Sequence, residues 1–309
     1  MKQESVQPVR SFKVRGALNK VIGLSAQERA AGVITASAGN HGQGVAYAAR
    51  VFGIPATVHV PEAANPLKVE AMERLGARVL HGGSNYAEAF ELALKTRART
   101  GASLVHAYDD LQVIAGQGTL AVELLGQLDR FDTILVPVGG GGLISGIASY
   151  LKARRPEVRI VGVEPAGADA MTRSLRAGAR MALDRVDTIA DGLAASAPGR
   201  LTFEIAHAFV DDMIVVSDEE MIDAVRLYFE WEHLLAEPAG AAAMAALLNH
   251  LEVAPTDRVV VVLSGANIGG EVMARALRMR RAGLGGDRPR PGPRQPAPKP
   301  SRRQPGLPD

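Results

Sequence analysis

The lysine at position 13 stands in the run SFKVRGA (residues 11–17), between an aromatic residue and a small, glycine-containing helix start. A lysine held in a semi-enclosed site loses its proton more easily than free lysine, whose pKa is about 10.4. A neutral, positioned amine is what Schiff-base chemistry with an aldehyde needs. The run alone is a weak indication of such chemistry, and it gains weight from the segments that follow.

Four consecutive glycines, Gly139, Gly140, Gly141 and Gly142, follow a predicted strand and precede a helix that starts near Leu143. Backbone N–H groups in such a turn can surround an anion at a helix N-terminus, so the run predicts a phosphate cradle. It is neither a dinucleotide fingerprint nor a Walker loop, because it lacks GxGxxG with a later acidic residue and lacks Gly-Lys-Ser/Thr. The alternative is a flexible strand-to-helix turn.

A second strand–turn–helix pattern lies at residues 37–44 (SAGNHGQG). Exposed backbone amides, the Ser37 hydroxyl and the Asn40 amide would suit a substrate carboxylate. An ordinary helix N-cap explains Ser37 equally well. We expect His41 to be structural rather than a general base, although a helix N-terminus lowers the pKa of an imidazole.

Three weaker candidates lie further along the chain. Ser264 ends the most apolar strand pattern, where a hydroxyl would point into the crevice in which open α/β sheets bind ligands. A simple strand-ending turn is the alternative for Ser264. Asp191 with Gly192, and Glu237 before Pro238, are weaker still, since Glu237 could merely complement a helix N-terminus.

The elements that must position these residues alternate along the chain. Short β-branched runs predict strands at 32–37, 56–61, 77–80, 103–106, 133–138, 159–164, 213–217 and 258–264. Helical patterns lie between them at 42–52, 66–75, 86–99, 116–125, 143–154, 219–234 and 239–251. This alternation predicts an α/β protein with mostly parallel sheets. Residues 32–109 have their own β-α-β-α-β order and are expected to form a small lobe inserted into a large lobe of residues 1–31 and 110–277.

The composition excludes several classes of site and partner. The chain has 309 residues, 47% of them hydrophobic, and no cysteine, which excludes disulfides, thiol catalysis and cysteine-bound metals. No apolar stretch of membrane-spanning length and no secretory signal appears, so we expect a cytoplasmic protein without a membrane partner.

The basic charge belongs to the end of the chain. From Arg278 onward there are nine Lys/Arg against two Asp, which leaves residues 1–277 with a net charge of −5 out of the total of +2. We therefore expect no nucleic-acid partner. Eight prolines between Pro289 and Pro308 predict that residues 278–309 form a disordered Pro/Arg-rich tail.

Seven segments together resemble the fold-type II pyridoxal-phosphate enzymes, the tryptophan synthase β-like fold. The resemblance is greatest to threonine ammonia-lyases (threonine dehydratases), with serine dehydratases and serine racemases as relatives. The resembling segments are residues 7–17, 37–44, 113–119, 136–143, 189–192, 236–241 and 263–267. The similarity as a whole runs in order from residue 2 to about residue 270. The resemblance implies two open, mostly parallel α/β lobes with pyridoxal 5'-phosphate between them, the large lobe binding the cofactor and the small lobe the substrate.

The resemblance also implies roles for the site residues. Lys13 would be the catalytic residue and would bind the cofactor covalently. The other cofactor contacts would be Gly139 to Gly142 with the phosphate, Ser264 with the pyridine nitrogen, Asn40 with the 3-oxygen, and Phe12 and Gly192 with the ring. The substrate carboxylate would lie against Ser37, Ala38, Gly39, Asn40 and His41, with Glu237 near the substrate's amino or hydroxyl group.

The activity implied by the resemblance is β-elimination of L-threonine and L-serine to 2-oxobutanoate or pyruvate and ammonia. The substrate would be a small-molecule amino acid, and the expected assembly is a homodimer or homotetramer. The alternatives are a racemase, lyase or β-replacement enzyme for another hydroxy or O-activated amino acid, or an inactive truncated scaffold. Ala38 stands where serine racemases carry a proton-donating serine, which argues against racemisation.

Two departures from the family pattern affect the expected fold and metal content. Lys13 lies close to the start, so an N-terminal helix and strand of the large lobe are expected to be missing, leaving an open sheet edge. Some relatives bind a divalent cation through a glutamate, a backbone oxygen and an acid. Glu164 and Ala168 are weak candidates for the first two, but Ala170 replaces the acid, so the metal content is left unknown.

Overall fold

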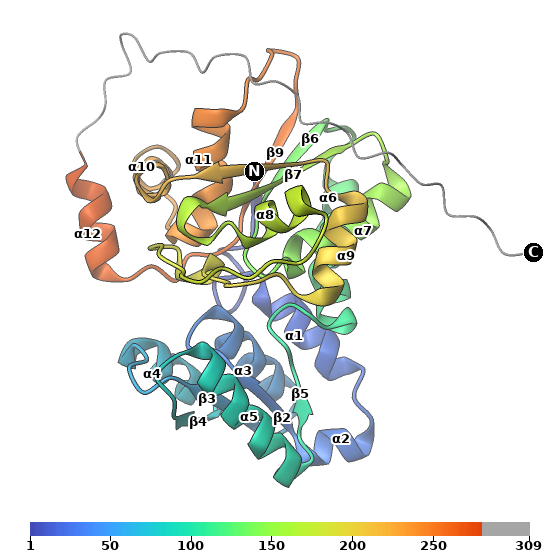
Figure 1. The fold of residues 1–309 in the computed structure, drawn as a ribbon, viewed down its shortest axis with the longest axis vertical. Coiled ribbons are helices and arrows are strands. Elements are labelled where there is room, and N and C mark those ends of the chain that lie inside the picture. Colours follow the sequence, from blue (N-terminus) through green and yellow to red (C-terminus); the bar gives the residue numbers. More distant parts are fainter. Residues whose placement is uncertain (280–309) are drawn as a thin grey trace, which may run out of the picture. The chain divides into compact units, whose positions relative to one another are not determined.

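The larger of two parallel sheets gathers strands from both ends of the chain (Figure 1). The computed structural model describes residues 1–279. The predicted tail at 278–309 therefore lies outside the described residues except for its first two. The larger sheet has the order β1-β9-β6-β7-β8, formed by β1 (Lys2–Gln3), β9 (Val259–Leu263), β6 (Thr133–Pro137), β7 (Arg159–Pro165) and β8 (Asp212–Val216). Every pair in it is parallel.

The smaller sheet is built from one continuous part of the chain. Its order is β4-β3-β2-β5, with β4 (Arg78–His81), β3 (Ala56–Val60), β2 (Val33–Ala36) and β5 (Ser103–Leu104), and all its pairs are parallel. The eight predicted strands all appear, with ends within two residues of the expected ones. The predicted α/β class with parallel sheets is confirmed.

Strand β1 was not predicted, because two residues are too few to show a hydrophobic pattern. Lys2 pairs with Val262 and Gln3 with Leu263, and the N–H of Glu4 continues the ladder by donating to the Leu263 carbonyl at 2.9 Å. From the sequence we expect an element to be missing before Lys13 and an open sheet edge. In the structure the two-residue strand β1 lies beside β9 at the edge of the larger sheet.

Helices surround both sheets. They are α1 (Lys13–Ile22), α2 (Ala26–Ala31), α3 (Asn40–Phe52), α4 (Pro66–Arg74), α5 (Tyr86–Thr100), α6 (Leu111–Gln127), α7 (Gly142–Arg154), α8 (Ala170–Ala177), α9 (Arg200–Phe209), α10 (Asp218–Glu232), α11 (Pro238–His250) and α12 (Gly270–Arg278), with 3-10 turns η1 (Ala166–Ala168) and η2 (Asp191–Leu193). Within residues 1–279, no helix has the length and apolar character needed to cross a membrane.

Helix α6 shows how a local polar group sets a helix end. The sequence pattern placed its start at Gly116, five residues too late. Asp110 caps the helix, since its carboxylate accepts the N–H groups of Gln112 (2.8 Å) and Val113 (3.2 Å). A capping carboxylate satisfies N–H groups that lack a partner in the first turn, so the helix begins directly after it.

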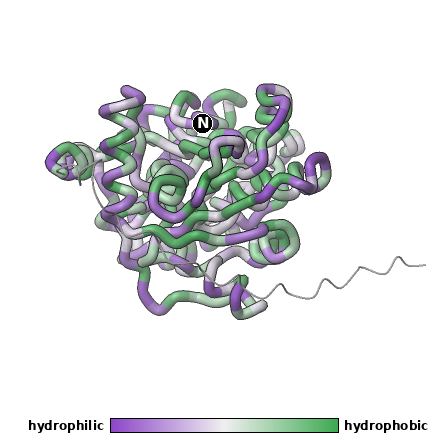
Figure 2. Tube along the Cα trace, turned by 90° about the horizontal axis from the view of Figure 1, so that it is seen from above, coloured by the Kyte–Doolittle hydropathy of each residue, from purple (hydrophilic) through white to green (hydrophobic). Residues whose placement is uncertain are grey.

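The central strands of the larger sheet are buried on both faces. Leu135, Val161 and Val261 pack on one face with residues of α10 and α11, while Ile134 and Val262 pack on the other with residues of α7. Successive side chains of a strand point to opposite faces, so a strand covered by helices on both sides is apolar without alternation. Figure 2 shows the hydrophobic residues running through the inner segments and the hydrophilic residues on the outer turns.

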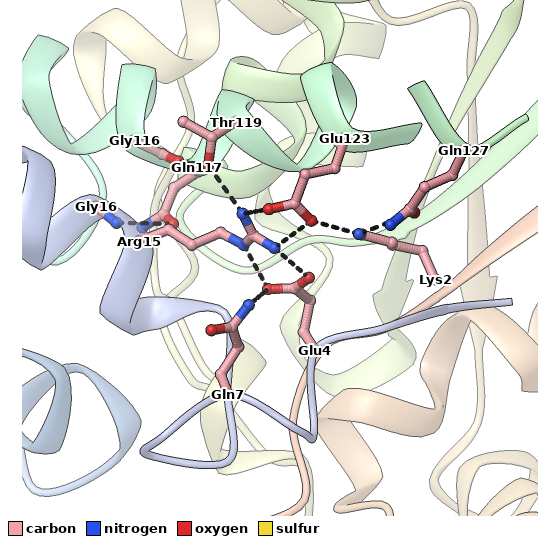
Figure 3. Close-up of polar contacts among 10 residues, drawn as sticks. All are labelled: Lys2, Glu4, Gln7, Arg15, Gly16, Gly116, Gln117, Thr119, Glu123 and Gln127. Carbon is pink, nitrogen blue, oxygen red and sulfur yellow. Dashed lines mark hydrogen bonds and ion pairs between the residues drawn. The ribbon is translucent and has the colours of Figure 1, made fainter. Parts of the chain in front are cut away.

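A charged cluster fixes the N-terminal segment to two helices (Figure 3). Arg15 in α1 donates to both oxygens of Glu4, at 2.6 and 2.8 Å, and to both oxygens of Glu123 in α6, at 2.7 and 2.8 Å. Glu4 is fully buried, and Lys2 also reaches Glu123 at 2.5 Å. The guanidinium therefore joins the end of β1 to α1 and α6.

Candidate active site

The glycine loop (residues 139–142) leads from the carboxyl end of β6 into α7. Gly141 has a φ of +94°, which side-chain-bearing residues rarely adopt, and a Cβ at Gly140 would lie 2.3 Å from the Tyr108 ring. Helix α7 has no side-chain cap. Its first N–H groups are therefore left for a ligand, and an anion suits them both by hydrogen bonding and by the helix dipole.

Lys13 is the first residue of α1, and its amine is enclosed. Its Nζ donates to the carbonyl of Ala107 at 2.9 Å and lies 5.2 Å from the centre of the Phe12 ring. Desolvation by burial lowers the pKa of Lys13 to about 8. A substantial neutral fraction of the amine is therefore present near pH 8, as nucleophilic and proton-transfer chemistry requires.

Backbone contacts hold the Lys13 run beside the carboxyl end of β9. Ser11 and Gly265 form an isolated antiparallel bridge, and the N–H of Phe12 donates to the Ser264 carbonyl at 3.1 Å. The Ser264 side chain is buried, and its hydroxyl donates weakly to the Ala239 carbonyl at 3.4 Å. Phe12 and Ser264, both predicted from the sequence, thus lie next to each other.

Asn40 and Glu237 meet although they are 197 positions apart. Asn40 is the first residue of α3, and its Nδ2 donates to Oε1 of Glu237 at 2.5 Å. Its Oδ1 accepts from Asn267 at 2.7 Å. A Cβ at Gly265 would lie 2.0 Å from Glu237 Oε1, so a side chain there would displace this carboxyl group.

Glu237 is 3% exposed and precedes α11. Burial, and secondly the charge of Asp191, raise the pKa of Glu237 to about 7, against the hydrogen bond from Asn40 and the charge of Lys68. A carboxyl group that keeps its proton near neutral pH can serve as a proton donor. Lys68 of α4 forms an ion pair with Asp191, which adjoins Gly192 in η2.

The turn at residues 37–41 follows β2, and its polar groups are partly engaged within the protein. The Ser37 hydroxyl accepts the N–H of Gly39 at 3.2 Å. His41 is buried, with Nε2 2.9 Å from the Val105 carbonyl. Burial and the Lys13 charge lower the pKa of His41 to about 3, so the ring is neutral and donates through Nε2. Ala38, a predicted substrate contact, is partly buried against the apolar core around β2 and β3.

The weak metal candidates, Glu164 and Ala168, lie at the end of β7 and in the turn that follows it. Glu164 is buried at the end of β7, and its carboxylate accepts from the N–H of Met171 (2.9 Å) and from the N–H and hydroxyl of Thr172 (both 2.7 Å). Ala168 lies in η1. Among residues 1–279, no group of three or more His, Cys, Asp or Glu side chains is placed to hold a metal ion. The bonds of Glu164 join the end of β7 to the start of α8, and its role as a metal ligand stays a prediction.

Sequence reasoning missed the segment at residues 106–109, which contacts several predicted site residues. Ala107 accepts from Lys13, and the Tyr108 ring lies against Gly140. Asp109 accepts the N–H groups of Leu201 (2.8 Å) and Arg200 (3.0 Å) at the start of α9. The string HAYDD carries no local pattern for these contacts, so only its place directly after a predicted strand could have pointed to it.

The residues present fit a phosphorylated aldehyde cofactor. The glycine loop supplies an uncapped helix start where side chains would clash, and the enclosed Lys13 amine has a lowered pKa. Both lie at the carboxyl ends of parallel strands, where open α/β sheets bind ligands. The family profile described as pyridoxal-phosphate dependent enzyme matches residues 1–265. The chain belongs to this family.

Similar proteins of the family support the resemblance in sequence and in fold. The chain is 44% identical to the L-threonine ammonia-lyase of Thermotoga maritima over 277 residues, which cover 90% of this chain and 69% of that protein. It is 41% identical to a serine racemase of Arabidopsis thaliana, covering 86% of this chain and 82% of that protein. The solved structure of the processed form of threonine deaminase isoform 2 from Solanum lycopersicum has a TM-score of 0.84 at 36% identity, covering 89% of this chain and 80% of that chain.

The chain covers only part of the length of the relatives that it matches. The chain spans 69% and 66% of the lengths of the Thermotoga maritima and Geobacter sulfurreducens L-threonine ammonia-lyases that it matches, about two thirds in each case. The fold-type II resemblance predicted from the sequence is confirmed, and the cofactor of the family is pyridoxal phosphate.

Proposed function

We propose that this chain is a pyridoxal-phosphate-dependent ammonia-lyase. It removes the hydroxyl and amino groups of L-threonine, and of L-serine, to give 2-oxobutanoate or pyruvate and ammonia. The observation that carries the proposal is the enclosed Lys13 amine, whose pKa is lowered to about 8, in a chain 44% identical to an L-threonine ammonia-lyase.

Lys13 has two tasks in this proposal. Pyridoxal phosphate, when bound, supplies an aldehyde for an amine and a ring that takes up the electron pair left at the substrate α-carbon. Lys13 would hold the cofactor, and its neutral Nζ would accept the α-proton. Proton transfer by a positioned side chain contributes about 100-fold to 10,000-fold in rate.

The remaining cofactor contacts follow from the family resemblance. The glycine loop would hold the phosphate through its N–H groups, and Ser264 would meet the pyridine nitrogen. Asn40 would bind the 3-oxygen, with Phe12 and Gly192 flanking the ring. A neutral serine cannot fix a full charge on the ring nitrogen, which favours prompt elimination over a long-lived carbanion.

Substrate contacts come from the turn after β2 and from Glu237. The turn residues, including Ser37, Gly39 and His41, would hold the carboxylate. Glu237 keeps its proton to about pH 7 and would donate it to the departing hydroxyl group.

Serine racemisation is the second candidate, because a serine racemase is 41% identical and is covered over 82% of its length. Racemisation needs a proton-carrying group on the opposite face of the substrate. Ala38 has only a methyl group at the position that the resemblance assigns to this task. Elimination is therefore the better supported reaction.

The test uses the full chain with added pyridoxal phosphate. We expect a visible absorbance band from the lysine-bound cofactor, 2-oxobutanoate from L-threonine, and little D-serine from L-serine. Lys13→Ala should abolish the band and the activity, whereas Lys95→Ala, an exposed lysine on α5, should change neither. An unchanged rate in Lys13→Ala, or D-serine as the main product, would contradict the proposal.

We further propose that the protein is a homodimer or homotetramer. Three large apolar side chains close together in the sequence, Phe229, Trp231 and Leu235 at and after the end of α10, are each more than 40% exposed, and exposed apolar surface can mark an interface. Sedimentation equilibrium at several concentrations would show a single subunit mass if the proposal is wrong. The cytoplasmic location stays a prediction from the sequence.

A further inference from the structure

The turn at residues 106–109 contacts both the lysine and the glycine loop, and one imidazole accepts two of its N–H groups. We propose that His106 is a positioning residue, which holds this turn so that Lys13 and the phosphate-binding glycine loop keep a fixed relation. The proposal rests on the proposed function for what the two parts bind. It concerns a residue that neither touches the reacting atoms nor belongs to the sequence-predicted site.

The imidazole of His106 acts as a hydrogen-bond acceptor for the turn. Its Nδ1 accepts the N–H of Tyr108 at 3.2 Å and the N–H of Asp109 at 2.8 Å. Only a neutral ring with its proton on Nε2 has a lone pair at Nδ1 for this purpose. The ring is fixed edge-on between Phe90 and Tyr108, with centroid distances of 5.5 and 4.8 Å.

Burial, more than the surrounding charges, favours the neutral form of the His106 ring. Burial is the largest influence and lowers the pKa of His106, and Lys13 acts in the same direction. Asp109 and Asp110 act in the opposite direction. The nearby His41 ring is itself neutral, because its pKa is lowered to about 3.

The turn presents its residues to the two parts of the site. The carbonyl of Ala107 accepts from Lys13 Nζ at 2.9 Å. The Tyr108 ring fills the space that a Cβ at Gly140 would need, 2.3 Å away, and its Cα lies 3.0 Å from the corresponding point at Gly142. A shift of the turn would therefore move the acceptor of Lys13 and the wall of the glycine loop together.

Asp109 connects the turn to the start of α9, which in turn contacts the glycine loop. Its carboxylate accepts N–H groups of Arg200, Leu201 and Thr202 at the start of α9. Thr202 in turn donates its hydroxyl to the Gly140 carbonyl at 2.6 Å. The turn thus contacts the glycine loop directly through Tyr108 and indirectly through α9.

Loss of the Nδ1 acceptor would leave two partly buried N–H groups without this partner and let the turn relax. A displacement of about 1 Å at an active site can cost about 100-fold in rate. Asparagine can place its Oδ1 where His106 has Nδ1, whereas glutamine carries its acceptor one bond further out. The pair His106→Asn and His106→Gln therefore separates the acceptor from the mere presence of a polar side chain.

The main test compares these two variants in the full chain. We expect His106→Gln to weaken pyridoxal phosphate binding at least tenfold and to lower kcat by about 10-fold to 100-fold, with a smaller change in KM. His106→Asn should keep the dissociation constant and kcat within about threefold of wild type. Equal behaviour of the two variants, whether both retain or both lose binding, would overturn the proposal.

A measurement without cofactor separates this inference from the proposed function. The rate at which an amine-reactive reagent labels Lys13, relative to Lys95, gives the protonation midpoint of Lys13 when followed against pH. We expect His106→Gln to shift this midpoint and His106→Asn to leave it in place. If wild type binds pyridoxal phosphate but forms no 2-oxobutanoate, the proposed function fails while this inference still stands or falls on the labelling result.

A second pair of variants serves if His106→Gln does not fold. Tyr108→Ala should raise the dissociation constant of pyridoxal phosphate at least tenfold, and Tyr108→Phe, which keeps the ring against Gly140, should not. Circular dichroism and thermal melting confirm that each variant is folded at the assay temperature. Wild-type binding by Tyr108→Ala would overturn the proposal.

Discussion

Burial shifts the pKa values of Lys13 and Glu237 in opposite directions, and both pKa values end close to neutral pH. The pKa of Lys13 falls to about 8, and that of Glu237 rises to about 7. In each case the apolar surroundings disfavour the charged form, which is the ammonium for lysine and the carboxylate for glutamate. A base and an acid with pKa values near the working pH are what proton transfer in both directions requires.

The first prediction concerns Glu237. Because the proton is held below about pH 7 and lost above it, the proposed proton donation should weaken as the pH rises through 7. Glu237→Gln should lower kcat for L-threonine by about 100-fold at pH 7 and remove this alkaline decline. The measurement is the pH profile of kcat. Glu232→Gln, an exposed glutamate near the end of α10, is the control and should keep the wild-type profile. An unaltered decline in Glu237→Gln would contradict the assigned role.

At the scale of the elements, two buried carboxylates join segments through hydrogen bonds and ion pairs. Glu4 ties the end of β1 to α1 through Arg15, and Glu164 ties the end of β7 to the start of α8. Each carboxylate has both oxygens engaged. Removal of one partner from such a contact leaves the other desolvated and unpaired, which costs more than the contact itself contributes.

The second prediction follows for Arg15. Arg15→Ala should lower the free energy of unfolding by about 3 kcal/mol, because the fully buried Glu4 loses its cationic partner and, among the side chains of residues 1–279, keeps only the weak bond from Gln7. Arg15→Lys should fall between this variant and wild type, since an ammonium cannot form the forked contact with two carboxylates. Urea unfolding gives the values. Arg74→Ala removes an exposed pair with Glu70 and should cost less than about 1 kcal/mol, so equal losses would refute the argument.

The third prediction concerns Glu164. Glu164→Ala should lower the free energy of unfolding by about 1–3 kcal/mol, because the first N–H groups of α8 and the Thr172 hydroxyl lose their acceptor. Thermal or urea unfolding in the presence and absence of EDTA is the measurement. Glu157→Ala, an exposed position before β7, is the matched control. A loss of stability in wild type on adding EDTA, absent from Glu164→Ala, would instead support Glu164 as a metal ligand.

At the scale of the whole described chain, one ion pair links the helices of the smaller sheet to the site loops of the larger one. Lys68 in α4 pairs with Asp191 in η2, next to Gly192 and within electrostatic reach of Glu237. The lysine side chain is 24% exposed and the aspartate 60%. Such a pair is screened by salt and contributes about 0–1 kcal/mol.

The fourth prediction concerns this pair. Because the pair joins α4 to the loop that precedes Gly192, Lys68→Met should raise KM for L-threonine by up to about fivefold and leave kcat nearly unchanged. High salt should likewise raise KM of the wild type, and KM of the variant should depend less on salt. Steady-state kinetics at low and high ionic strength tests both points. A fall in kcat with an unchanged KM would show that the pair acts elsewhere.

The sequence by itself determined the elements and the local parts of the site. The alternation of β-branched runs and helical patterns, the four glycines after β6 and the Lys13 run depend on neighbours in the chain, so their patterns can be read locally. Elements without such a pattern escaped prediction, as β1 and the start of α6 show. Strand β1 has two residues, too few to show a hydrophobic period. The start of α6 is set by the Asp110 side chain, which caps the helix six residues before Gly116.

Only the tertiary structure decided how the parts of the candidate site meet and which pKa shifts they have. The acceptor of Lys13 lies 94 positions away at Ala107, and the partner of Asn40 lies 197 positions away at Glu237. The lowered pKa of Lys13 and the raised pKa of Glu237 come from desolvation by segments distant in the chain. That desolvation cannot be predicted from composition or spacing, because it arises only once the segments have packed together.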